Sequence, residues 1–369
     1  MDPAAAARAR DARQVVAGAL NPGAARSMAD PRLRTRLQTR EFFVAPGVYD
    51  AISTLLAARA GFDAVYASGY WLTASYLGIP DAGLATFTDM LDRVSRGVRK
   101  SRVPVIADAD TGFGGLLNVH HTVRGYEAAG VSAIQIEDQE FPKKCGHTPY
   151  RRVIPLEDMV AKVKVACDAR SSRDFLVIAR TDARTGWGLD VAIRRGQAYA
   201  AAGADVVFVE SLQSEDEMRR ACAEIDAPLM ANMSDGGKTP IRSAAELAAL
   251  GYACAIFPAT AALAASAAVE RAYAHLRAHG TSRGVDTPLF SFDEFCRMIG
   301  FEDVWAFEEK WKDVLDRGTP GAGAATVDAA GAAPGARRCA PPRRARANTT
   351  TAAPRSTPTT SARTSTRAT

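Results

Sequence analysis

Three acidic side chains stand at the ends of two short apolar runs. Asp108 and Asp110 follow the run at 104–107, and Glu137 follows the run at 133–136. Carboxylate oxygens are the hard ligands that Mg²⁺ or Mn²⁺ prefers, and no His or Cys stands beside them at zinc-like spacing. Ion pairing with arginines is the alternative, but three acids packed together without a cation raise one another's pKa at a cost. We therefore predict a divalent-metal site at these residues.

Further polar groups with complementary chemistry follow three later apolar runs. Arg180 has a planar guanidinium that suits a substrate carboxylate. Glu210 can orient this arginine, and Asn232 can donate to a carboxylate or enolate oxygen. The glycine-rich TGFGG at 111–115 lacks the Lys-Ser/Thr of a phosphate loop. We interpret its glycines as giving the backbone room to pass beside the metal. Together these residues indicate a small substrate that carries carboxylates.

The segment EDQEFPKKCGHTPY at 137–150 concentrates charge in a chain that is otherwise rich in alanine. Cys145 follows Lys143 and Lys144 and stands two residues before His147. Neighbouring cations stabilise a thiolate, which tunes the thiol as an acid or a nucleophile. A zinc site is disfavoured because no other Cys or His joins at ligand spacing, and a Cys–His dyad within one loop rarely aligns. An inert loop cysteine is the remaining alternative.

These residues need a scaffold that brings the ends of distant apolar runs together. Eight runs alternate with Ala-, Leu-, Glu- and Arg-rich segments of helical spacing, several of which end on Gly. The runs are at 42–45, 64–67, 104–107, 133–136, 175–179, 205–209, 228–231 and 254–257. This alternation predicts a (β/α)8 barrel, in which the carboxyl ends of the strands form one catalytic face. A doubly wound open sheet is the alternative, and eight strands in strict alternation favour closure.

The two ends of the chain depart from this pattern. We expect residues 1–38 to be a leader, partly disordered or helical, although its Ala and Arg also resemble an organelle transit peptide. Residues 39–317 then hold the barrel and a C-terminal helical region. Residues 318–369 are a basic tail of low complexity, which has too little apolar surface to offset the entropy of ordering.

Charge and cysteine content exclude several classes of protein. From residue 319 onward there are eight Arg and one Asp, a net +7 against +5 for the whole chain, which leaves −2 for the rest. The body therefore gives no electrostatic reason to expect nucleic acid, and no apolar run is long enough to span a membrane. Six cysteines without CxxC pairs indicate no disulfide framework, so we expect a cytoplasmic protein.

Several short motifs, taken in order, resemble one enzyme family. They are SGY at 68–70, LGIPDAG at 77–83, DADTGFG at 108–114, IEDQ at 136–139, KKCGH at 143–147, ARTDA at 179–183, ES at 210–211 and NMS at 232–234. This order is similar to the isocitrate lyase/phosphoenolpyruvate mutase superfamily. KKCGH after IEDQ resembles its carbon–carbon lyases, which act on isocitrate, 2-methylisocitrate or 2,3-dimethylmalate.

The resemblance implies an architecture and a set of roles. It implies a (β/α)8 barrel whose C-terminal helices, here within 291–311, are swapped between subunits of a homotetramer. It also implies Mg²⁺ (or Mn²⁺) as cofactor and a small carboxylate as substrate. The implied site consists of Asp81, Asp108, Asp110 and Glu137 around the metal; Ser68, Gly69, Tyr70, Gly146, Arg180, Glu210 and Asn232 on the substrate; and Tyr66, Lys143, Lys144, Cys145 and His147 in catalysis.

The mechanism that the resemblance implies is a retro-aldol cleavage. Tyr66 matches the base that removes the proton of the substrate's 2-hydroxyl. The metal and Arg180 then stabilise the developing charge while the C2–C3 bond breaks. Cys145 protonates the resulting carbanion, which releases a carboxylate beside a 2-oxo acid such as pyruvate.

The chain departs from the 2-methylisocitrate lyases at two places. Leu263 stands where an arginine of that group assists a third carboxylate, and Tyr70-Trp71 replaces glycines. Both changes add apolar surface and favour the 2,3-dimethylmalate lyase branch. The alternatives are oxaloacetate decarboxylation or phosphonate chemistry on the same barrel, such as that of a carboxyvinyl-carboxyphosphonate phosphorylmutase, and a binding barrel without catalysis.

Overall fold

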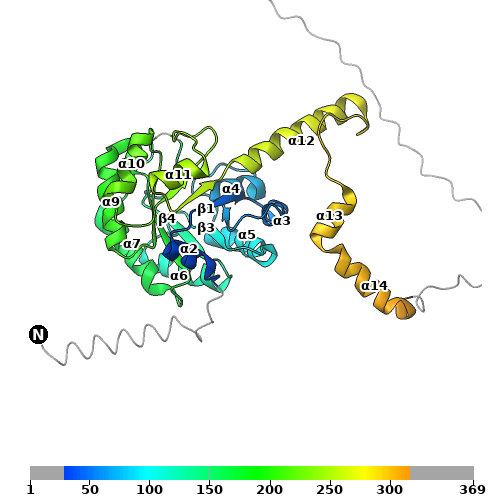
Figure 1. The fold of residues 1–369 in the computed structure, drawn as a ribbon, viewed down its shortest axis with the longest axis horizontal. Helices are drawn as coiled ribbons and strands as arrows, with labels where there is room; N and C mark the ends of the chain where they lie inside the picture. The colour runs from blue at the N-terminus through cyan, green and yellow to red at the C-terminus, as the bar shows by residue number, and fades with distance from the viewer. Residues whose placement is uncertain (1–28, 149, 316–369) are drawn as a thin grey trace, which may run out of the picture. The chain divides into compact units, whose positions relative to one another are not determined.

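Eight parallel strands curve into a nearly closed barrel in the computed structural model, which describes residues 29–148 and 150–315 (Figure 1). The strands are β1 (Phe43–Val48), β2 (Val65–Ala67), β3 (Val105–Asp108), β4 (Ala133–Glu137), β5 (Leu176–Thr181), β6 (Val206–Val209), β7 (Met230–Asn232) and β8 (Cys254–Phe257). Their order is β6-β5-β4-β3-β2-β1-β8-β7. A parallel bridge between Val207 and Leu229 joins β6 to β7. The predicted barrel is confirmed, each predicted run overlaps a strand, and the open-sheet alternative is wrong.

The strands are mostly apolar, apart from polar residues such as Glu137 and Asn232 near their carboxyl ends, because both of their faces are buried. In β5, Leu176 and Ile178 pack in the cluster that fills the barrel interior. The alternate residues Val177 and Ala179 pack against the surrounding helices. Phe208 and Tyr66 bring aromatic rings into the interior cluster. This packing makes the barrel a solid support for the residues at its carboxyl end.

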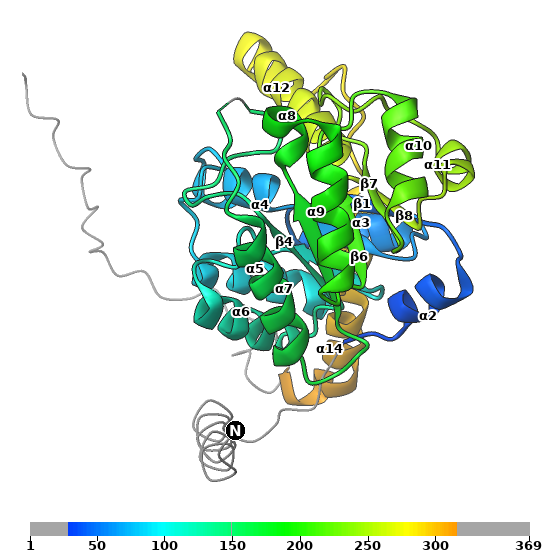
Figure 2. The ribbon, with the colours of Figure 1, turned by 90° about the vertical axis from the view of Figure 1, so that its left-hand side faces the viewer.

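Helices cover the outer face of the barrel, as Figure 2 shows for α7 and α9. They are α3 (Ala51–Arg59), α4 (Gly69–Leu77), α5 (Phe87–Lys100), α6 (Leu116–Ala128), α7 (Leu156–Ala169), α8 (Ala183–Trp187), α9 (Leu189–Ala201), α10 (Glu215–Glu224) and α11 (Ala244–Leu250). The glycines that were predicted to end helices adopt positive φ, as at Gly203 (106°) and Gly251 (102°). A glycine takes this conformation without steric cost, which allows the chain to turn into the next strand.

Helix α2 (Arg32–Thr39) precedes the first strand, within the predicted leader. Its Leu33 is fully buried and belongs to the cluster that fills the barrel interior. Arg34 donates from Nη2 to Oδ1 of Asp205 at 2.8 Å, next to the start of β6. Most of the leader and the predicted tail lie outside the described residues.

The chain divides into two compact units, residues 1–305 and 306–369. The last helices are α12 (Thr260–His279), α13 (Phe292–Ile299) and α14 (Phe301–Leu315). Ala262 is the single buried residue of α12. Exchange of this region between subunits stays a prediction. Within the described residues, no helix is long and apolar enough to cross a membrane.

Candidate active site

A cavity of about 340 Å³ lies at the carboxyl ends of the strands. All the predicted site residues except Gly69 and Asp110 line it. Glu137 closes β4, Asn232 closes β7 and Arg180 lies near the end of β5, so the barrel brings together residues that are far apart in the sequence. The cavity is of the size that encloses a small ligand.

Lys143 lies between two of the predicted metal ligands. Its Nζ is 2.6 Å from Oδ1 of Asp81 and 2.6 Å from Oδ1 of Asp110, and the lysine side chain is 2% exposed. Burial opposes the charge of Lys143, but the surrounding carboxylates outweigh it and raise the pKa of this lysine well above its ordinary value. Lys143 was expected to stabilise the thiolate of Cys145, whereas its ammonium is paired with these acids instead.

Asp108 and Asp110 are held by the loop that follows β3. The backbone N–H of Asp110 donates to Oδ1 of Asp108 at 2.9 Å, and Asp110 has a φ of 49°. Gly69 belongs to the same contact, since a Cβ there would lie 2.6 Å from Oδ2 of Asp108. Burial and the neighbouring Asp108 and Asp81 raise the pKa of Asp110 to about 7, although Lys143 opposes this shift. This cluster carries more negative charge than its cations neutralise.

The carboxylates fit a divalent cation by their chemistry and by their charge. Within the described residues, no three or more His, Cys, Asp or Glu side chains are arranged as they stand to hold a metal. Oε1 of Glu137 is nevertheless buried without a hydrogen-bond partner in this part of the chain. Burial raises the pKa of Glu137 well above its ordinary value, although Arg180 opposes the shift. A Mg²⁺-sized cation among these oxygens would supply the missing positive charge.

Arg180 lines the cavity and contacts three buried acids. Its Nε and Nη2 donate to the two carboxylate oxygens of Asp182, each at 2.9 Å. Nη1 lies 3.3 Å from Oε2 of Glu137, and Nη2 lies 3.3 Å from Oε2 of Glu210. Its guanidinium carbon lies 5.1 Å from the centre of the Phe208 ring. These acids therefore hold the guanidinium of Arg180 in a fixed orientation at the wall of the cavity.

A second buried acid supports Asp182 from the outer side of the strands. Asp138 accepts from the N–H of Asp182 at 2.8 Å and from the hydroxyl of Thr181 at 2.7 Å. On α9, Tyr199 and Arg195 donate to the same carboxylate at 2.7 and 3.0 Å. Asp138 is thus fully hydrogen-bonded, and its role is to hold β4, β5 and α9 in register.

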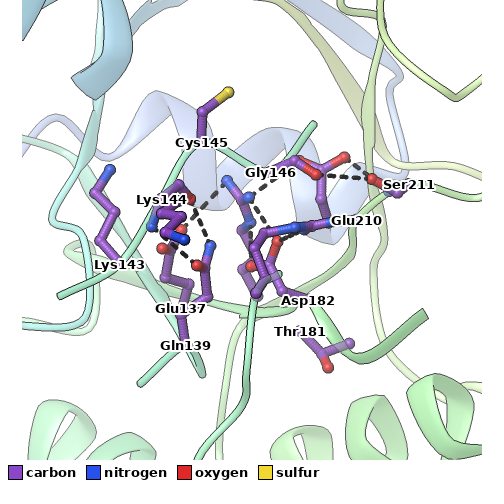
Figure 3. A network of polar contacts seen from close by, with 12 residues as sticks. Glu137, Gln139, Lys143, Lys144, Cys145, Gly146, Thr181, Asp182, Glu210 and Ser211 are labelled. Atoms are coloured by element: carbon purple, nitrogen blue, oxygen red, sulfur yellow. Dashed lines mark hydrogen bonds and ion pairs between the residues drawn. The ribbon is translucent and has the colours of Figure 1, made fainter. Parts of the chain in front are cut away.

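The Cys145 segment is tied to the site at several points (Figure 3). Gln139 exchanges two hydrogen bonds with the backbone of Lys144, at 2.8 and 3.0 Å. Ser211 donates to the carbonyl of Gly146 at 3.1 Å. A Cβ at Gly146 would lie 2.3 Å from Nη2 of Arg180, so the backbone approaches as closely as glycine permits. The segment therefore sets Gly146, the residue after Cys145, against Arg180.

Burial is the main influence on the pKa of Cys145. It raises the pKa of this thiol, and the backbone of His147 and the charge of Arg180 oppose the shift without cancelling it. The expectation that neighbouring lysines stabilise a thiolate is therefore wrong for this conformation, because Lys143 is paired with acids. A protonated thiol suits a proton donor better than a nucleophile.

Other predicted residues have contacts that leave groups free for a ligand. Asn232 donates to Oε2 of Glu210 at 3.0 Å, while its Oδ1 is buried without a partner among the described residues. His147 packs against Gly237, where a Cβ would lie 2.9 Å from Cε1. Tyr66 donates to Oε1 of Gln135 at 2.8 Å, and burial raises its pKa well above the ordinary value, so it is a neutral phenol here.

Part of the cavity lining was not predicted from the sequence. These residues are Thr148, Phe208, Ser234, Asp235, Gly236, Gly237, Ile256, Pro258 and Ala259. Ser234 to Gly237 follow β7, so the strand-end position that identified Asn232 extends to them. Phe208 and Ile256 face inward within their strands, which alternation along the strand could have indicated. Leu263 and Trp71, which were singled out for their apolar bulk, also line the cavity.

Fold and site together define a class of protein, a (β/α)8 barrel enzyme with a carboxylate-rich cavity at the catalytic face. The chain belongs to the family described as phosphoenolpyruvate phosphomutase, whose model matches residues 33–277. This match confirms the family that the motifs indicated.

The chain is also similar to individual named enzymes and to a solved structure. The chain is 46% identical to 2,3-dimethylmalate lyase of Eubacterium barkeri over 76% of its length and 97% of the relative. It is 45% identical to 2-methylisocitrate lyase of Aeropyrum pernix, over 73% and 87% of the two chains. A structure of oxaloacetate acetylhydrolase with the inhibitor 3,3-difluorooxalacetate matches with a TM-score of 0.73 and 33% identity, over 77% and 97%. The lyase names confirm the expected enzyme class, a carbon–carbon lyase.

Proposed function

We propose that this protein cleaves a 2-hydroxy di- or tricarboxylate into a 2-oxo acid, such as pyruvate, and a second carboxylate. The favoured substrates resemble 2,3-dimethylmalate first and 2-methylisocitrate second. The observation that carries the proposal is the contact of Gly146 with Arg180, which sets the thiol-bearing segment against a buried carboxylate-binding group. The similarity to lyases of these two acids supports it.

The roles of the side chains follow from their charge and position. Arg180 binds one substrate carboxylate, with Asn232 as a second donor. Ser68 and Tyr70 line the part of the cavity proposed for the pyruvate-like half. Tyr66 is a neutral phenol here, so it can accept the 2-hydroxyl proton, as the resemblance implies, only in its ionised form. Cys145 donates a proton to the carbanion carbon after the C2–C3 bond breaks. The electron pair of that bond becomes the new C–H bond, so no external oxidant or reductant is needed.

The carboxylates of Asp81, Asp108, Asp110 and Glu137 are the residues that would hold Mg²⁺. When bound, the cation supplies positive charge that stabilises negative substrate oxygens and favours the ionised forms of neighbouring acidic groups. We expect dialysis against a chelator to abolish turnover and added Mg²⁺ to restore it. Full activity after chelation would contradict this assignment.

The cavity wall supports the choice of substrate. Leu263, Pro258, Ile256 and Trp71 form apolar lining, which suits alkyl substituents and provides no cation for a third carboxylate. Binding of a charged group against such a surface would cost its desolvation. This wall favours a methylated dicarboxylate over a tricarboxylate.

The decisive experiment presents the Mg²⁺-supplemented enzyme with 2,3-dimethylmalate, 2-methylisocitrate, isocitrate and oxaloacetate in parallel. Release of pyruvate or glyoxylate is followed for each acid. We expect 2,3-dimethylmalate to be turned over with the highest kcat/KM. Preference for the tricarboxylates would overturn the argument from Leu263, and turnover of oxaloacetate alone would overturn the lyase proposal.

The second candidate is cleavage of oxaloacetate, by decarboxylation or by hydrolysis. The structural likeness to oxaloacetate acetylhydrolase favours keeping it. Cys145→Ser separates the two candidates. If the thiol is the acid of a lyase, kcat should fall by about 10²–10⁴-fold. Oxaloacetate decarboxylation needs no such donor and should survive the substitution.

A further inference from the structure

Arg151 connects the turn that carries Cys145 to the acid behind Arg180. Its Nε donates to the carbonyl of Thr148 at 3.1 Å. Its Nη1 pairs with Oδ1 of Asp182, and its Nη2 donates to the hydroxyl of Thr185 at 2.8 Å. The Arg151 side chain is 3% exposed. Each of the three guanidinium nitrogens of Arg151 therefore has a partner, and the side chain is buried.

The contact at Thr148 reaches Cys145 through a short turn. The N–H and the hydroxyl of Thr148 both donate to the carbonyl of Cys145, at 3.0 and 2.8 Å. Arg151 holds the carbonyl of the same threonine, so both backbone polar groups of Thr148 are hydrogen-bonded. A displacement of Arg151 would remove the restraint on the Thr148 end of the turn that carries the thiol.

The contact at Asp182 reaches Arg180. Oδ1 of Asp182 accepts from Nη2 of Arg180 and also pairs with Nη1 of Arg151. Burial raises the pKa of this carboxyl, but Arg180 and Arg151 together outweigh burial and lower it. Without Arg151, the carboxylate would lose one of the two cations that compensate its burial, and it would be free to rotate with the fork of Arg180.

We propose that Arg151 is a positioning residue for both Cys145 and Arg180. It holds the Cys145 turn through Thr148, and it holds Arg180 through Asp182, with which both arginines pair. This inference rests on the proposed function only for what the two groups do with substrate. A lysine cannot replace Arg151 fully, because one ammonium cannot reproduce three donors in a fixed planar fork. The neighbouring Arg152 provides a contrast, since it pairs with Glu140 while its side chain is 80% exposed.

The test measures the alkylation of Cys145 by iodoacetamide in the full-length protein, located by mass spectrometry. Arg151→Met removes the fork and keeps the aliphatic bulk, and Arg152→Met is the matched control. Cys254 is 2% exposed inside the barrel, so its alkylation in the same sample reports global unfolding. We expect Arg151→Met to raise the alkylation rate of Cys145 about tenfold, which matches the loss of hydrogen bonds to charged groups. Cys254 and the Arg152→Met variant should stay at the wild-type rate.

Two outcomes would overturn the proposal. One is an unchanged rate at Cys145 in Arg151→Met. The other is an equal rise at Cys145 and Cys254, which would make Arg151 a general stabilising residue. Because alkylation needs no substrate, this result stands even if the proposed reaction is wrong.

Arg151→Lys distinguishes the contact of Arg151 with Thr148 from its contact with Asp182. Its ammonium can pair with Asp182 but cannot also hold Thr148, so we expect fast alkylation of Cys145 with a KM close to wild type. Arg151→Met should raise KM as well, because Arg180 loses its fixed orientation. The KM values are measured for the acid that the substrate panel identifies. Equal KM values in the two variants would exclude the connection through Asp182.

Discussion

Gly146 occupies a position where even one extra carbon meets Arg180 and Glu210, the groups that we propose bind substrate. A Cβ would lie 2.3 Å from Nη2 of Arg180 and 2.9 Å from Oε2 of Glu210. We expect Gly146→Ala to lower kcat/KM by about 10²-fold, because a displacement of catalytic groups by ~1 Å costs roughly that much. Steady-state kinetics measures it. Gly186→Ala is the control, since a Cβ there meets nothing within 4 Å, and equal activity in both variants would contradict the prediction.

The thiol of Cys145 should titrate above the pH at which an ordinary cysteine does. Burial raises the pKa of Cys145. The protonated form therefore persists to higher pH than in the unfolded chain, where the pKa is about 8.5. Only the thiolate reacts with iodoacetamide, so the alkylation rate of the native protein should rise later on the pH axis than that of the denatured protein. Coincident pH profiles would contradict this prediction.

The residues of the site were largely predictable one by one, but their pairings were not. Cys145 and Lys143 are separated by one residue, and their proximity in sequence predicted an electrostatic contact. The structure pairs Lys143 with Asp81 and Asp110 instead, because buried carboxylates attract an ammonium more strongly than a neutral thiol does. Two residues that are close in sequence can have different interaction partners when the backbone between them turns.

At the scale of elements, the Asp138 network joins β4 and β5 to α9. Its carboxylate accepts from Tyr199, Arg195 and Thr181, and Arg195 is 3% exposed. Asp138→Ala should lower the free energy of unfolding by about 3–5 kcal/mol, because it leaves the Arg195 charge buried without its partner. Urea denaturation gives the value. Asp216→Ala on α10, where the side chain is 90% exposed, should change it by less than about 0.5 kcal/mol.

Strands were easier to predict than the loops that connect them to helices. Each strand is an apolar run buried on both faces, a pattern that is visible without neighbours. The loop after β7 contributes Ser234 and Asp235 to the cavity, yet its composition is that of any polar turn. Only the closure of the barrel brings this loop opposite the Cys145 segment, since the two are far apart in sequence.

At the scale of the whole molecule, α12 presents large apolar side chains to solvent. Val269 is 47% exposed, Tyr273 68% and Leu276 42%. The expected homotetramer with swapped helices would cover such a surface. We predict that the wild-type chain sediments as a tetramer and that Val269→Glu with Tyr273→Glu shifts it to smaller species. Glu270→Gln on the same helix is the control, and a wild-type monomer in analytical ultracentrifugation would exclude the assembly.

The sequence alone predicted the barrel, its eight strands and most of the charged residues that line the cavity. These depend on local patterns, namely buried runs, helix ends on glycine and polar groups at strand ends. The tertiary structure alone decided which charges pair, that burial raises the pKa of Cys145, and that Asp182 pairs with both Arg180 and Arg151. Such features depend on burial and on distances between segments that are remote in sequence. Because desolvation and Coulomb energy both change steeply over a few ångströms, only a folded arrangement specifies them.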